Sequence, residues 1–185
     1  MAAVSLRPRR EPRLIRIDAN KTLAVLVDAT NVTVKLHYCT EPEIRSFIRC
    51  NGANCVACRT GKSVQERILI PVYLPASREM GTLSVETTRR PGALGPQLIW
   101  LQAKRKTSMA AISIHALKYK VEALKWDDED EHFQAKVHDF RAHVTAGRVD
   151  LRRLYPKVDN DRLAKVPEFV RTLAILEGSD GGDSD

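Results

Sequence analysis

Aromatic residues are scarce in this sequence of 185 residues: they make up 5% of it, whereas hydrophobic residues together make up 43%. The hydrophobic content suffices for a packed core, but so few rings leave little material for surfaces that stack on nucleobases. No apolar run approaches the about 20 residues that a membrane helix needs. Residues 1–7 place no apolar segment behind their positive charge, so we expect no secretory signal. These absences predict a cytoplasmic protein that does not bind a membrane.

Two patterns that would indicate an enzyme are incomplete. Residues 56–63 end in Gly-Lys-Ser like a phosphate-binding loop, but Val56 stands where that loop needs a glycine. A zinc deaminase needs His-x-Glu and Pro-Cys-x-x-Cys, yet Asn54 precedes Cys55 and the sequence contains no His-x-Glu. We therefore predict that the protein is not an enzyme and has no catalytic residue.

Charge is divided unevenly along the chain. Residues 1–120 contain 20 basic and 8 acidic residues, whereas residues 121–185 contain 10 and 15, which together give the net charge of +7. Such asymmetry is typical of a nucleic-acid-binding body with an acidic partner segment, and an unevenly charged, solvated surface is the alternative.

Residues 1–16, with five arginines and two prolines, are predicted to form a flexible basic arm. Residues 178–185 are predicted to form an acidic disordered tail.

The middle of the chain has the pattern of a β-structure. Residues 32–39 alternate with a period of two, which places Val34, Leu36 and Tyr38 on one face, toward the core, and His37 with Cys39 on the other. Pro71 removes a backbone donor and so indicates an edge strand or a bulge. Short strands separated by turns predict a small β-barrel or sandwich over residues 17–120. The expected strands are 22–27, 32–39, 67–74, 82–87, 97–103 and 110–119.

Residues 121–177 have the pattern of helices. An apolar stripe runs from Phe133 to Val144, and Gly147 is placed to end that helix. Pro167 is placed at the first position of a second helix. The apolar face of this second helix is predicted to consist of Phe169, Val170, Leu173 and Leu176. The fold class is thus α+β, a small barrel followed by C-terminal helices.

The four cysteines follow the spacing Cys39-x10-Cys50-x4-Cys55-x2-Cys58. A Cys-x2-Cys pair on a tight turn lets two thiolates bind one Zn²⁺, and four sulfur ligands leave no open position for a substrate. The spacing therefore predicts a structural zinc site made of these four cysteines. A site in which His37 replaces Cys39 is one alternative, because His37 lies on the same strand face. Four unrelated thiols in the core are another.

The segment 50–58, followed by the strand 67–73, is similar to the zinc loop inserted in the OB-fold of single-stranded-DNA-binding proteins from T4-type bacteriophages. Those proteins hold zinc with one histidine and three cysteines, the last two as Cys-x2-Cys, and end in an acidic tail that contacts replication partners. The resemblance covers residues 32–74. It implies an OB-like barrel, a bound zinc ion, single-stranded nucleic acid as ligand, with DNA favoured over RNA, and a bacterial or phage-infected cell.

An OB-type groove binds the strand through basic residues and aromatic platforms. Tyr73 and Trp100 point away from the apolar faces of their predicted strands and are the candidate stacking residues. A second interpretation is a zinc-stabilised adaptor that binds a protein through its C-terminal helices or acidic tail. The candidate phosphate contacts are Arg59, Lys62, Arg89, Arg90, Lys104, Arg105 and Lys106.

Overall fold

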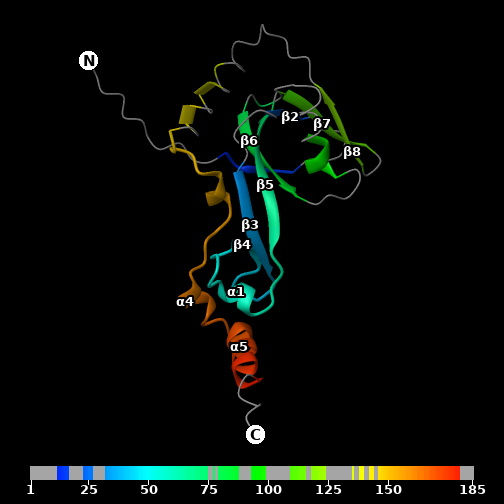
Figure 1. The fold of residues 1–185 in the computed structure, drawn as a ribbon. Coiled ribbons are helices and arrows are strands. Elements are labelled where there is room, and N and C mark those ends of the chain that lie inside the picture. The colour runs from blue at the N-terminus through cyan, green and yellow to red at the C-terminus, as the bar shows by residue number, and fades with distance from the viewer. Residues whose placement is uncertain are drawn as a thin grey trace, which may run out of the picture. The chain divides into compact units, whose positions relative to one another are not determined.

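We analysed the protein in a computed structural model (Figure 1). Its described residues form two compact units. The first unit contains the residues up to Thr33 together with Arg67–Leu154. The second unit contains Val34–Glu66 together with the residues from Tyr155 onward. The segment that contains the cysteines therefore groups with the C-terminal helices, a division that cuts across the predicted barrel domain at 17–120. The described residues are 12–16, 23–26, 32–74, 77, 79–87, 93–98, 109–115, 118–123, 135, 138–139, 142–143 and 146–179, with only the backbone of 23–26, 73, 109–115 and 118–123.

The first unit is built on a strongly curled sheet, a half-barrel, which confirms a small barrel-like α+β fold (Figure 1). Its strands follow the order β1-β6-β5-β2-β7-β8 in the described part of the chain. Neighbouring strands are antiparallel, except that β1 runs parallel to β6. The strands are β1 (Leu14–Ile15), β2 (Leu23–Leu26), β5 (Gln65–Leu74), β6 (Glu79–Glu86), β7 (Met109–His115) and β8 (Lys118–Ala123).

Alternating apolar residues of β5 and β6 supply the core of this unit. Ile70 and Val72 of β5 pack with Leu83 and Val85 of β6, as a period of two predicts. The proline of β5 is not on an edge strand, because β5 lies between β6 and β2. Among the described residues the pairing with β2 covers only Val72 and Tyr73, so it begins next to Pro71 and does not need the N–H group that proline lacks.

Two predicted strands differ from the structure. Residues 94–98, which include the start of the strand predicted at 97–103, are helical, and Leu94 and Leu98 pack into the core one helical turn apart. Residues 99–103 lie outside the described part of the chain. The strand predicted at 110–119 is two strands, β7 and β8, which pair as an antiparallel hairpin.

The end of the predicted basic arm belongs to this sheet. Leu14 and Ile15 form β1 opposite Thr82 and Leu83. The backbone N–H of Thr82 donates to the carbonyl of Arg13 (2.8 Å), and its hydroxyl donates to the carbonyl of Pro12 (2.8 Å). Residues 14–15 of the arm predicted at 1–16 are therefore part of the sheet, whereas residues 1–11 lie outside the described part of the chain.

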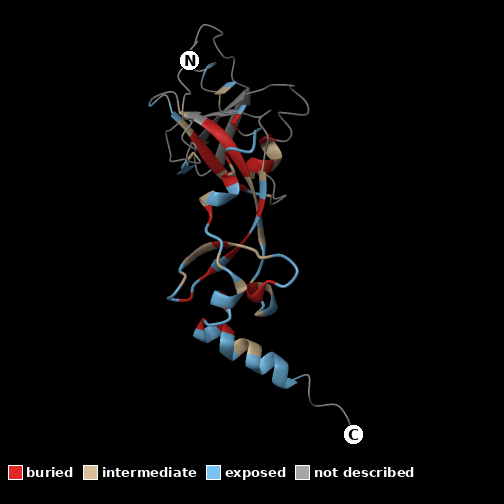
Figure 2. Cartoon of the chain, turned by 90° about the vertical axis from the view of Figure 1, so that its left-hand side faces the viewer, coloured by how far each residue is buried: buried red, intermediate tan, exposed pale blue. Residues whose placement is uncertain are grey.

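The second unit combines a hairpin, a turn of helix and the C-terminal segment. The strands β3 (Val32–Cys39) and β4 (Ser46–Arg49) pair antiparallel, and the short helix α1 (Val56–Arg59) follows. The C-terminal segment contributes α4 (Asn160–Leu163) and α5 (Pro167–Ser179). Figure 2 shows that much of α5 is exposed. The buried core of this unit consists of Cys39, Ile48, Val56, Leu163, Val166 and Phe169.

The C-terminal helices follow the prediction in part. Residues 135, 138, 139, 142 and 143 are helical, and Gly147 adopts the predicted positive φ of +69°. Helix α5 begins at Pro167 and buries Phe169, but Val170 and Leu176 are 46% and 47% exposed, so half of the predicted apolar face is uncovered. The helix continues through Ser179, which shortens the tail predicted at 178–185. None of the described helices is long and apolar enough to cross a membrane.

The pairing of β1 with β6 depends on a glycine. A Cβ atom at Gly81 would lie 1.9 Å from Cδ1 and 2.6 Å from Cγ1 of Ile15. We expect Gly81→Ala to lower the free energy of unfolding by about 1–3 kcal/mol, because the clash forces β1 to shift. Gly178→Ala is the control, since nothing lies within 4 Å of its Cβ position and alanine favours a helix. Equal stability of the two variants in denaturant titrations would contradict this account.

Candidate metal centre

Four potential metal ligands converge in the second unit. They are His37, Cys50, Cys55 and Cys58, and their ligand atoms all lie within 4.8 Å of one another. His37 lies on β3, Cys50 follows the last residue of β4, and Cys55 and Cys58 lie at the start and inside α1. The group could therefore hold one metal ion with four protein ligands.

The local chain geometry explains this convergence. Cys55 is the N-cap of α1, and Cys58 lies three residues later, so both side chains lie on one face of a single helical turn. Gly52 and Gly61, at φ +86° and +80°, bend the chain before and after that turn, a conformation that glycine adopts without strain. The N–H of Cys55 closes the first bend on the carbonyl of Gly52 (3.1 Å).

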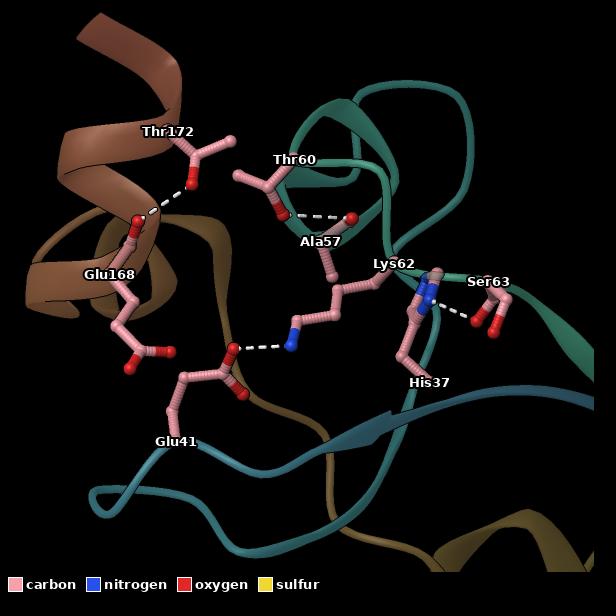
Figure 3. Close-up of polar contacts among 8 residues, drawn as sticks. All are labelled: His37, Glu41, Ala57, Thr60, Lys62, Ser63, Glu168 and Thr172. Atoms are coloured by element: carbon pink, nitrogen blue, oxygen red, sulfur yellow. Dashed lines mark hydrogen bonds and ion pairs between the residues drawn. The ribbon is translucent and has the colours of Figure 1, made fainter. Parts of the chain in front are cut away.

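The imidazole of His37 is oriented for metal binding. Its Nδ1 lies 3.0 Å from the carbonyl oxygen of Ser63, the contact that Figure 3 draws. Because a carbonyl only accepts hydrogen bonds, Nδ1 carries the proton and Nε2 presents its lone pair. Nε2 lies 3.5 Å from Sγ of Cys55 and 3.4 Å from Sγ of Cys58. A carbonyl that fixes the histidine tautomer in this way is a usual feature of metal sites.

The thiols influence one another's ionisation. Burial, together with the neighbouring Cys50 and Cys55, raises the pKa of Cys58 to about 12. Burial also acts to raise the pKa of Cys55, but hydrogen bonds from the backbone of Asn51, Cys58 and Ala57 outweigh it and lower that pKa. Without a cation the site therefore favours the thiolate of Cys55 over that of Cys58, and a bound metal ion would supply the charge that stabilises both.

Cys39 lies outside this group. Its side chain is fully buried in the apolar cluster with Ile48 and Phe169. Burial, together with the charge of Glu41, raises its pKa to about 11, so this thiol stays protonated at neutral pH. The structure thus brings together three of the four cysteines of the predicted site and adds His37, the alternative fourth ligand.

A buried carboxylate forms an ion pair with a partly exposed lysine beside the metal cluster. Nζ of Lys62 lies 2.5 Å from Oε1 of Glu41, whose side chain is 1% exposed, and 5.8 Å from the centre of the Phe169 ring. Figure 3 shows the Lys62 side chain directed at Glu41. The hydrogen bond to Glu41 raises the pKa of Lys62. This lysine, predicted to contact phosphate, therefore neutralises a carboxylate inside the unit.

The other predicted nucleic-acid contacts are only partly described. Arg59 forms an exposed ion pair with Glu177 of α5 at 3.4 Å, and of Tyr73 only the backbone, on β5, is described. The remaining candidates lie outside the described residues: Arg89, Arg90, Trp100, Lys104, Arg105 and Lys106.

Two asparagines that no sequence pattern indicated connect residues 50–58, the metal loop, to the C-terminal segment. Oδ1 of Asn160 accepts from the N–H of Val56 (3.1 Å) and from Nδ2 of Asn51 (3.0 Å), and its Nδ2 donates to the carbonyl of Asn54 (2.8 Å). Nδ2 of Asn51 also donates to the carbonyl of Val158 (2.7 Å). More than a hundred residues separate the partners in each of these contacts, so no short-range pattern in the sequence could have indicated them.

No family model, curated protein or solved structure matches the chain. The metal centre is therefore defined by the four side chains themselves and by the hydrogen bonds that orient them.

The two alternative fourth ligands can be separated by metal analysis. We expect His37→Ala and Cys58→Ala to lose the metal and the stability that it provides, because metal-binding free energy contributes to folding. Cys39→Ala should retain about one metal ion per chain and lose only about 1 kcal/mol of stability, from one deleted buried group. Loss of metal from Cys39→Ala together with retention in His37→Ala would show that the four-cysteine site is the correct one.

The role of Asn160 can be tested in the same assay. We expect Asn160→Ala to lower the free energy of unfolding by about 1–3 kcal/mol, because the buried N–H of Val56 loses its acceptor. The substituted protein should also release its metal faster to a chelator. Asn160→Asp keeps an acceptor for Val56 and should lie between Asn160→Ala and the wild type. A chelation rate unaffected by either change would leave Asn160 without a role in the metal loop.

Proposed function

We propose that the protein is a non-enzymatic, single-stranded nucleic-acid-binding protein with a structural zinc site. The observation that carries this proposal is the division of charge between the two units. Residues 34–66 and 155–185 contain 9 of the 30 basic and 10 of the 23 acidic residues, which leaves 21 basic and 13 acidic residues in the segments of the curled-sheet unit. A basic, curled sheet is the arrangement that an OB-type groove uses to follow a phosphate backbone.

The spacing of the ligand atoms supports zinc as the metal. With zinc–sulfur bonds of about 2.3 Å and zinc–nitrogen bonds of about 2.0–2.1 Å, tetrahedral geometry separates two sulfurs by about 3.8 Å and a sulfur from a nitrogen by about 3.6 Å. Three of the six observed separations are close to these values: 3.6 Å between Sγ of Cys50 and Cys58, and 3.5 and 3.4 Å from Sγ of Cys55 and Cys58 to Nε2 of His37. All six lie within 4.8 Å. Soft thiolates with an imidazole are also the ligands that zinc prefers.

Four protein ligands argue for a structural role. A catalytic zinc keeps one position for water or substrate, whereas a structural zinc is closed by four side chains. One histidine and three cysteines, the last two as Cys-x2-Cys, is also the donor set implied by the resemblance to the phage single-stranded-DNA-binding proteins. The zinc would join β3, the end of β4 and α1 into one support, and its role in function would be to hold that support rigid.

A second candidate function is a zinc-stabilised adaptor for another protein. It is favoured by α5, on which Val170, Ile175 and Leu176 are 46%, 69% and 47% exposed. A helix with exposed apolar side chains can bind a partner protein by placing some of them in a groove.

An oligonucleotide titration tests the proposal. Labelled single-stranded DNA, single-stranded RNA and duplex DNA are titrated with the full chain at several salt concentrations. We expect the single strands to bind more tightly, with log K falling linearly with log salt by about 0.7 for each phosphate contact. Replacing Lys104, Arg105 and Lys106 together should flatten this slope and weaken binding to all sequences alike, because phosphate contacts do not read bases.

Substituting three basic residues elsewhere provides the control. Arg152, Arg153 and Lys165 can be replaced together, which changes the net charge by the same amount without touching a predicted contact. Equal effects of the two triple variants would show a non-specific response to charge. If the wild-type protein binds no oligonucleotide at low salt, the proposal is wrong and the adaptor function takes its place.

A further inference from the structure

Aromatic side chains gather on one face of the β3–β4 hairpin. The chain has only ten aromatic residues, and three of them contact one another here. The ring centres of Tyr38 and Phe47 lie 4.9 Å apart, and those of Phe47 and Tyr155 lie 6.3 Å apart in an edge-to-face arrangement. Tyr38 and Phe47 are direct cross-strand partners, so their side chains share this face.

The outermost ring of this cluster is exposed. Tyr38 is 51% exposed, although the alternation of its strand predicted a core position. Leu36, on the same face, is completely buried, so the face is covered at Leu36 and open at Tyr38. Among the described residues Tyr38 is the only aromatic side chain in the set of large, exposed hydrophobic residues.

The inner rings hold Tyr38 in place. Tyr155 is 8% exposed and Phe47 is partly buried, so exposure increases outward along the three rings. The N–H of Arg49 donates to the carbonyl of Pro156 (2.9 Å), which fixes the segment of Tyr155 against β4. His37, a ligand of the candidate metal centre, lies on the opposite face of the same strand. A ring ordered in advance loses little entropy when it stacks on a ligand.

Positive charge flanks the rings. Arg49 is two residues from Phe47 on β4 and pairs across the hairpin with Leu36, so it lies on the aromatic face. Its Nε is buried and has no hydrogen-bond partner in the described part of the chain. Arg45, exposed, precedes β4 and adopts a φ of +41°, a conformation that non-glycine residues rarely adopt. Both arginines lie two residues along the chain from Phe47, the ring on which Tyr38 packs.

We propose that this face, formed by Tyr38, Phe47, Tyr155, Arg45 and Arg49, is a stacking platform for a base of single-stranded nucleic acid. The inference rests on the proposed function and adds the residues that carry it. An aromatic face binds any base through its π-surface, and adjacent guanidinium groups attract the phosphates. Exposed aromatic area next to unpaired cations is complementary to a nucleotide. A surface that binds an apolar helix of a partner protein would instead be lined by aliphatic residues.

Substitutions of Tyr38 test the platform by fluorescence anisotropy. The full, zinc-loaded chain is titrated against a labelled oligothymidylate. We expect Tyr38→Ala to weaken binding by about 5- to 150-fold, the range for the loss of one stacked base, and to leave the salt slope unchanged. Tyr38→Phe should bind like the wild type. Arg49→Gln should instead reduce the salt slope by about 0.7.

Two further variants separate stacking from folding. Tyr38→Leu keeps an apolar side chain against Phe47 but has no ring, so it should retain the metal and the thermal stability and still lose affinity. Val64→Ala, which removes a side chain of similar exposure (46%) in the same unit, should change nothing. Wild-type affinity in Tyr38→Leu or Tyr38→Ala would overturn the platform and leave the proposed function standing. Absence of binding by the wild type would overturn both and favour a protein as the occupant of this face.

Discussion

Three thiols and one imidazole lie within 4.8 Å of one another in the second unit and could hold a metal ion. The elements around this group are short: β4 and α1 have four residues each, and elements of that length are not stable by themselves in water. Burial and neighbouring sulfurs raise the pKa of Cys58, whereas the pKa of Cys55 is lowered, so a thiolate at Cys58 is opposed beside one at Cys55. A bound metal ion would reverse this repulsion, because it would stabilise each thiolate and join β3, the end of β4 and α1.

The C-terminal segment completes the same unit from the other side. Phe169 and Leu163 cover the apolar cluster around Cys39, and Asn160 satisfies backbone groups of the metal loop. The ion pair of the partly exposed Lys62 with the buried Glu41 lies at this contact, where removal of Lys62 would leave a buried charge uncompensated. The metal loop and the last helices therefore stabilise each other, which explains why residues distant in sequence form one compact unit.

This division assigns separate tasks to the two units. The curled-sheet unit has the surplus of basic residues, while the metal-centred unit has nearly equal numbers of basic and acidic residues. In the proposed function the first supplies the electrostatic attraction, which is long in range and weakened by salt. The second supplies a rigid hairpin whose outer face presents Tyr38 and whose inner face holds His37. Stacking depends on an ordered ring and not on net charge. The positive charge can therefore come from the first unit and the ordered ring from the second.

Local sequence determined the elements in which a short-range pattern decides the structure. The Cys-x2-Cys turn, the period of two in β3 and β5, the proline at the start of α5 and the glycine at 147 were all predicted from spacing, because they depend on neighbours within a few residues. The strand predicted at 97–103 begins instead in a helical segment, since Leu94 and Leu98 gain more from the core at helical spacing. Only the tertiary structure decided between His37 and Cys39: both point to the same side of β3, and the choice depends on Ser63, Phe169 and the C-terminal segment. It also decided that Tyr38 is exposed, because the face of a strand is buried only as far as another segment covers it, and here the cover ends at Leu36.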